Sequence, residues 1–69
     1  MSYAELDSDT RAIAERVLTR KQLDVFKLWC AEVGLRRIGI MLDIHEATAR
    51  GHLRRAIQKI DIEKRRIAA

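Results

Sequence analysis

The residues that interrupt helices are scarce in this sequence of 69 residues, which has no proline and three glycines. Ala, Leu, Ile, Arg, Glu and Lys dominate instead, and this composition favours helices over sheets. The single Cys30 excludes an internal disulfide and cannot hold a zinc ion alone, so we expect a small core residue there. These absences predict one all-α domain over residues 1–69, a small bundle of three to four helices.

Long hydrophobic runs are also missing. No apolar stretch approaches the roughly 20 residues that span a membrane, and the first five residues lack the basic-then-apolar profile of a secretion signal. We therefore expect a cytoplasmic protein, associated with the nucleoid if it is bacterial.

Features of enzymes are equally scarce. There is no glycine-rich phosphate loop, no nucleophile beside a credible base, and no group of Cys, His and carboxylates spaced for a metal. The three aromatic residues are widely separated, which argues against stacking on single-stranded bases. We expect no enzymatic activity, no cofactor and no metal.

The charge is distributed unevenly along the chain. Residues 1–19 carry two arginines against four acidic side chains, a net charge of −2, whereas residues 20–69 carry twelve Lys and Arg against six acidic side chains, a net charge of +6. Basic side chains bind a polyanion by releasing its condensed counterions. A nucleic acid is therefore a candidate partner, although a solvated basic face has the same composition.

Capping signals predict the first helices. Residues 2–17 form either one helix or a short turn followed by a helix from about Asp9. Residues 19–22, Thr-Arg-Lys-Gln, have the capping-box form, in which the side chains of Thr19 and Gln22 cap each other's backbone N–H groups. A second helix is expected from about residue 20 to residue 33, with Gly34 as a left-handed stop.

Two further helices are predicted around a short turn. Residues 35–42 have apolar side chains at helical spacing, and a turn is expected at residues 43–45. The long last helix runs from about residue 46 to residue 60, with Lys64 interrupting its stripe and Ile67 able to extend it. The apolar stripe of that helix comprises Ala49, Leu53, Ala56, Ile57 and Ile60.

Residues 35–60 fit a helix-turn-helix. This motif needs a short helix, a three-residue turn and a second helix whose exposed face enters the major groove of DNA. Gly39 is the small residue required where the two backbones approach, and Ile38, Leu42, Ile44 and Ala49 occupy the apolar positions. An ordinary helical hairpin would show a similar pattern, since apolar residues recur at such spacings in any small bundle.

Residues 18–60 resemble region four of bacterial sigma factors and the related LuxR-type domains. The resemblance rests on the run Leu18-Thr19-x-x-Gln22-x-x-Val25-x-x-Leu28, then Gly34, Ile38-Gly39-x-x-Leu42-x-Ile44, Thr48-x-Arg50-x-His52-Leu53-x-Arg55-Ala56-x-x-Lys59-Ile60. It implies a four-helix DNA-binding domain with residues 46–60 as recognition helix. Because the DNA-binding domain would stand without any further domain, a regulator from a phage or a mobile element is one source that fits.

The sequence departs from that pattern within the motif. His45 stands where those families have a serine cap, so Asp43 with Glu46 is an alternative cap, and the first residue of the helix is open between 44 and 46. Asp43 replaces the usual turn glycine, while Gly39 and Ala49 make the motif's core lighter. Gly51 inside the reading helix either lets the backbone approach the groove or is simply tolerated, at a cost of about 1 kcal/mol relative to Ala.

Two sets of residues are predicted to contact DNA. The bases would be met by Glu46, Ala47, Thr48, Arg50, Gly51 and Arg54, since Arg suits guanine, Glu suits the cytosine amino group and Ala suits the thymine methyl. The phosphates would be met by Arg20, Lys21, Arg36, Arg37, Arg55 and Lys59. Each of these cations is otherwise a solvated surface charge, and His52 is expected to pack or hydrogen-bond beside the core.

The sequence therefore predicts a sequence-specific regulator that binds double-stranded DNA. The alternative is a protein-interaction module that docks on RNA polymerase or forms a homodimer through its last helix. Residues 60–69, with Ile62 and Ile67, are the segment that would pair two chains.

Overall fold

The computed structural model describes residues 2–69, which form helices and no strand. A 3₁₀ turn, η1 (Tyr3–Glu5), precedes α1 (Ser8–Val17), α2 (Arg20–Cys30), α3 (Leu35–Leu42) and α4 (Glu46–Ala68). The expectation of an all-helical bundle is confirmed. In this part of the chain no helix is long and apolar enough to cross a membrane.

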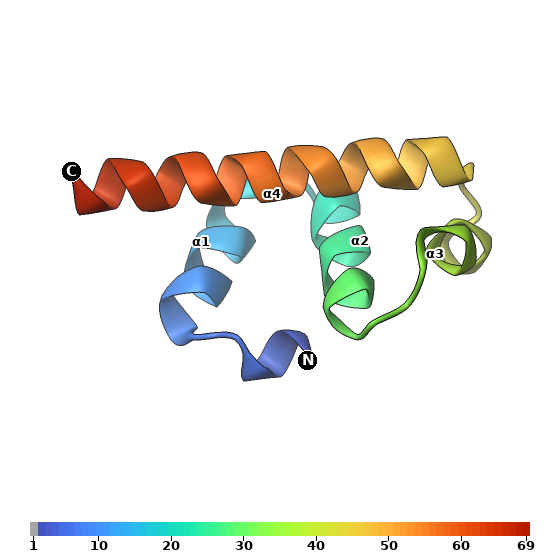
Figure 1. The fold of residues 1–69 in the computed structure, drawn as a ribbon, viewed down its shortest axis with the longest axis horizontal. Helices are drawn as coiled ribbons and strands as arrows, with labels where there is room; N and C mark the ends of the chain where they lie inside the picture. Colours follow the sequence, from blue (N-terminus) through green and yellow to red (C-terminus); the bar gives the residue numbers. More distant parts are fainter. Residues whose placement is uncertain (1) are drawn as a thin grey trace.

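The long helix α4 organises the bundle. It runs the length of the molecule, and α3, α2 and α1 lie along the same side of it, in that order from its N-terminus to its C-terminus (Figure 1). The molecule measures 38 × 21 × 15 Å, and its longest extent follows α4 in Figure 1. The opposite side of α4 is consequently left uncovered.

Side-chain caps fix where the first two helices begin. Asp7 accepts hydrogen bonds from the backbone N–H and the hydroxyl of Thr10, so the N-terminal segment is a short 3₁₀ turn followed by a helix. These bonds hold the pKa of the Asp7 carboxyl below its usual range. The capping box predicted for α2 is present, with Thr19 accepting from the Gln22 N–H and Gln22 from the Thr19 N–H.

The end of α2 differs from the prediction. The helix ends at Cys30, not Val33, and the left-handed residue is Glu32 with φ 65°. The N–H of Val33 donates to the carbonyl of Leu28 and that of Glu32 to Trp29, which is the Schellman arrangement. Gly34, expected to be left-handed, has φ −68° and is the N-cap of α3.

The last helix is longer than predicted, because it continues through Lys64 to Ala68. Four residues of the predicted apolar stripe are buried, namely Ala49, Leu53, Ala56 and Ile60. The fifth, Ile57, has a side chain that is 48% exposed. The three shorter helices cover a narrower part of α4 than the sequence pattern suggested.

Nine buried apolar side chains form the core, and every α-helix contributes to it. They are Ile13, Ala14, Val25, Phe26, Ile38, Ala49, Leu53, Ala56 and Ile60. Cys30 is half-buried against this cluster, and burial raises the pKa of its thiol. Phe26 is buried and meets Tyr3 edge to face, whereas Trp29 remains 43% exposed.

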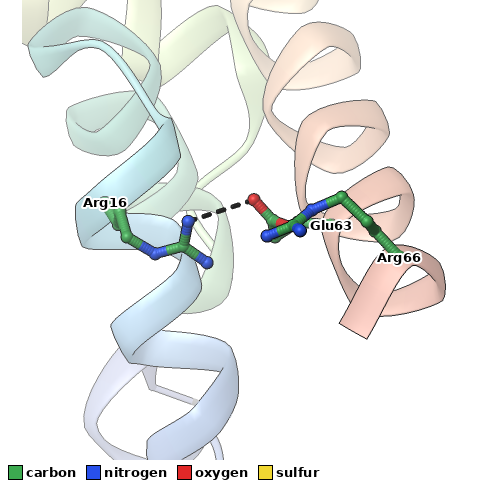
Figure 2. A network of polar contacts seen from close by, with 3 residues as sticks. All are labelled: Arg16, Glu63 and Arg66. Atoms are coloured by element: carbon green, nitrogen blue, oxygen red, sulfur yellow. Dashed lines mark hydrogen bonds and ion pairs between the residues drawn. The ribbon is translucent and has the colours of Figure 1, made fainter. Parts of the chain in front are cut away.

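A small ionic network joins the first and the last α-helix. The Arg16 guanidinium on α1 lies 3.1 Å from the Glu63 carboxylate on α4, and Arg66 binds the other oxygen of that carboxylate (Figure 2). The two guanidinium groups, Arg66 first, hold the pKa of Glu63 below its usual range. The network therefore links α1 to the C-terminal half of α4.

Candidate nucleic-acid interface

The contact between α3 and α4 depends on a missing side chain at Gly39. This residue is buried, and a Cβ added there would lie 2.7 Å from the carbonyl oxygen of Ile44 and 3.4 Å from the backbone nitrogen of Glu46. The carbonyl of Gly39 also accepts from the N–H of Ile44 at 2.8 Å. The end of α3 and the start of α4 are thus held backbone against backbone, as the sequence predicted for this glycine.

The connection between α3 and α4 consists of the three predicted residues, 43–45. Asp43 adopts the left-handed conformation, with φ 54° and ψ 48°, and its N–H donates to the carbonyl of Ile40. Together with the bond from Ile44 to Gly39, this is a second Schellman ending. Asp43 therefore adopts the left-handed conformation expected of a glycine at this turn.

The N-cap of α4 is His45, so the alternative cap formed by Asp43 with Glu46 is wrong. The Nδ1 of His45 accepts a hydrogen bond from the N–H of Ala47 at 3.1 Å. Accepting through Nδ1 requires an imidazole without a proton on that nitrogen. The helix accordingly begins at Glu46, the last of the starts between residues 44 and 46 that were open from the sequence.

The six residues predicted to meet bases lie together on the first three turns of α4. Ala47, Thr48, Arg50 and Arg54 are exposed, and Glu46 and Gly51 are partly exposed. The buried residues of the same turns, Ala49 and Leu53, face the bundle. The predicted set thus occupies the accessible side of one helix end, beside α3 (Figure 1).

The arginines of this surface differ in their partners. Arg50 Nη2 lies 3.3 Å from Glu46 Oε2, one helical turn away, and both side chains are about half exposed at 55% and 44%. Within residues 2–69, Arg54 makes neither an ion pair nor a hydrogen bond. Arg54 is consequently free to donate to an acceptor, whereas Arg50 presents its remaining N–H donors beside the Glu46 carboxylate.

No tight packing surrounds Gly51, unlike Gly39. A Cβ added there would meet Arg55 Nη1 at 3.6 Å, which is ordinary van der Waals contact with the end of a flexible side chain. The interior of the protein therefore gives no reason for a glycine at this position.

Five of the six predicted phosphate contacts are exposed cations. Arg36 and Arg37 occupy the first turn of α3, Arg20 and Lys21 the first turn of α2, and Arg55 the third turn of α4. Both pairs stand at helix N-termini, where backbone N–H groups and the helix dipole also favour an anion. Arg36, Arg37 and Arg55 belong to the two helices of the predicted motif, whereas the start of α2, with Arg20 and Lys21, lies beside Lys59 of α4.

Lys59 differs from the other five. Its Nζ donates to Gln22 Oε1 at 2.9 Å, and the residue is half-buried. That same amide oxygen caps α2, so the buried Gln22 ties the start of α2 to α4. The sequence showed Gln22 only as part of the capping box, since nothing local indicates a partner 37 residues away.

His52, expected to pack or hydrogen-bond beside the core, is half-buried, and its buried Nδ1 lacks a hydrogen-bond partner in the described structure. Nowhere in residues 2–69 do three His, Cys, Asp or Glu side chains gather in a way that could hold a metal ion.

The chain matches no protein-family model, and no curated protein or solved structure is significantly similar to it. Conclusions about function therefore depend on the residues of this surface.

Proposed function

We propose that this protein is a sequence-specific regulator of transcription that binds double-stranded DNA, with α3 and α4 as a helix-turn-helix. The first part of α4, about residues 46–60, would enter the major groove. The observation that carries the proposal is the uncovered end of α4, which displays Arg50, Arg54 and Arg55 while α3 is locked against it through Gly39. The sequence pattern within residues 18–60 that suggested a resemblance to region four of sigma factors points to the same function.

The physical basis is the fit of an exposed helix to the groove. A B-DNA major groove is about 12 Å wide and admits one α-helix with its side chains. Arg54, which has no partner within residues 2–69, would donate to guanine O6 and N7. Arg36 and Arg37, at the start of α3, would contact phosphates and set the register.

The alternative of pairing two chains through the last helix has less support. Ile57, Ile62 and Ile67 are exposed on α4, at intervals of five residues. Five residues correspond to about 140° around a helix with 3.6 residues per turn, so the three side chains point in three directions. A symmetric pair of helices needs one apolar stripe instead. RNA polymerase stays the second candidate partner, on which the protein would dock as an adaptor.

A binding titration with duplexes selected from a random pool tests the proposal. We expect salt-dependent binding of the wild-type chain, followed by fluorescence anisotropy, since counterion release accompanies each phosphate contact. Absence of binding even at low ionic strength would contradict the proposal. Retention of polymerase by a chain carrying both Arg50→Ala and Arg54→Ala would favour the adaptor function.

A further inference from the structure

The surface of α4 that is proposed to contact bases carries an acidic side chain, which binding to DNA does not by itself explain. Between Glu46 and Ile60, Glu46 is the one acidic residue, and the other charged side chains are basic. A carboxylate at this place repels the phosphates that the proposed function requires the surface to attract. Its geometry indicates a compensating role.

The ion pair between Glu46 and Arg50 forms a row of hydrogen-bonding groups. Arg50 has several N–H donors, and one of its terminal nitrogens lies 3.3 Å from a Glu46 carboxylate oxygen. The two side chains are about half exposed and leave the same face of α4, four residues apart. From Arg50 to Glu46, the pair therefore offers N–H donors followed by a carboxylate acceptor.

One base pair presents the complementary row. In the major groove a G·C pair offers guanine N7 and O6 as acceptors and then the cytosine N4 amino group as donor. O6 and N4 are hydrogen-bonded to each other at about 2.9 Å, close to the separation within the ion pair. An A·T pair offers acceptor, donor, acceptor, which matches at the first position and mismatches at the next two.

We infer that Glu46 and Arg50 act as one unit that reads a single G·C base pair, Arg50 on guanine and Glu46 on the cytosine amino group. This inference rests on the proposed function and assigns a base pair to it. Glu46 contributes mainly to discrimination, because its carboxylate gains a partner on cytosine and meets the O4 acceptor of thymine on an A·T pair.

Sequence selection from random duplexes, followed by titration of single-pair variants, tests the unit. The chains compared are the wild type, Glu46→Ala, Arg50→Ala and the control Asp61→Ala. Asp61 pairs with Arg65 at 3.2 Å with the same i,i+4 spacing on the same helix, outside the predicted reading residues. The control therefore removes an equal charge and a similar ion pair.

We expect the wild type to prefer G·C over A·T at one position by about 5- to 150-fold. Glu46→Ala and Arg50→Ala should both lose most of that preference, and Asp61→Ala should keep it. In the selected duplex, N4-methylcytosine at this pair should weaken the wild type more than Glu46→Ala. Inosine in place of guanine, which leaves N7 and O6 intact, should change the affinity of neither the wild type nor Glu46→Ala.

Four results would overturn the inference. Loss of the preference in Arg50→Ala but not in Glu46→Ala would mean that Arg50 reads guanine alone. A fall in the melting temperature of Glu46→Ala with unchanged base preference would reduce Glu46 to a helix-stabilising residue. Selective wild-type binding without a G·C pair would also remove the inference, yet leave the proposed function standing, whereas failure to bind any duplex would remove both.

Discussion

Gly39 and Gly51, both on the helices of the candidate interface, differ in what a methyl group would meet. At Gly39 it would lie 2.7 Å from a backbone oxygen, and at Gly51 it would touch the end of the Arg55 side chain at 3.6 Å. A contact of 2.7 Å with backbone forces the connection to shift, while the Arg55 side chain needs no movement. The two glycines therefore predict opposite effects on stability.

Gly39→Ala should destabilise the protein. Overpacking costs about 1–3 kcal/mol, and Ala returns at most about 1 kcal/mol through helix propensity. We expect the free energy of unfolding, measured by urea denaturation, to fall by about 1 kcal/mol. A variant as stable as the wild type would show that the backbones of α3 and α4 are not held together here.

Gly51→Ala should stabilise the protein by about 1 kcal/mol, because the helix interior gains a better helix former without a clash. We also expect weaker binding to duplex DNA, since the added methyl group would keep the α4 backbone away from the base edges. Denaturation and anisotropy titration of the same preparation separate the two effects. A stabilised variant with unchanged affinity would place Gly51 outside the interface.

At the scale of elements, α1 and α4 are linked by charge as well as by apolar packing. The pKa of Glu63 is below its ordinary value, mainly because of Arg66 and then Arg16, so the unfolded chain takes up this proton first as the pH falls. The stabilisation from Glu63 is therefore present above the ordinary carboxyl pKa of about 4.3 and lost as the pH drops below it.

Glu63→Gln tests that link. We expect a lower melting temperature than the wild type at pH 7, with the difference shrinking as the pH falls toward 3. Thermal melts across this range, with Arg16→Ala and the double variant alongside, separate the α1 contact from the bond to Arg66. A difference that is the same at every pH would contradict the assigned cause.

Helix starts were more predictable from the sequence than helix ends. The start of α2 follows from Thr19 and Gln22, three residues apart, and the connection at 43–45 follows from apolar residues on both sides of it. The end of α2 depends on Glu32 adopting a left-handed conformation, and no local pattern favours Glu32 over Gly34 for that conformation. Non-glycine residues occupy that region when the surrounding chain imposes it.

The chemistry of the site was likewise predictable only in part. Helical spacing alone places Arg50 and Arg54 on the accessible side of α4, because one buried face defines the other. The bond from Lys59 to Gln22 was not predictable, since it joins two helices whose relative position arises from packing. His45 as a cap was also missed, because an imidazole accepts a backbone N–H less commonly than a serine hydroxyl does.

At the scale of the whole molecule, the exposed cations predict the salt dependence of DNA binding. If Arg20, Lys21, Arg36, Arg37 and Arg55 all neutralise phosphates, log K against log salt should have a slope of about −4 to −5. Arg36→Ala should make the slope less steep by about 1. Arg65→Ala is the control, because that highly exposed cation lies near the far end of α4. Equal slopes for the wild type and Arg36→Ala would exclude a phosphate contact at the start of α3.

The most direct test of a major-groove function for α4 is the base preference of Arg54→Ala. Affinities are measured for the selected duplex and for its single-pair variants, with Arg36→Ala as the comparison. We expect Arg54→Ala to lose about 1–3 kcal/mol on the selected duplex and to relax the preference at one base pair, while Arg36→Ala weakens all duplexes alike. Binding by Arg54→Ala with wild-type affinity and wild-type preference would contradict a major-groove function for α4.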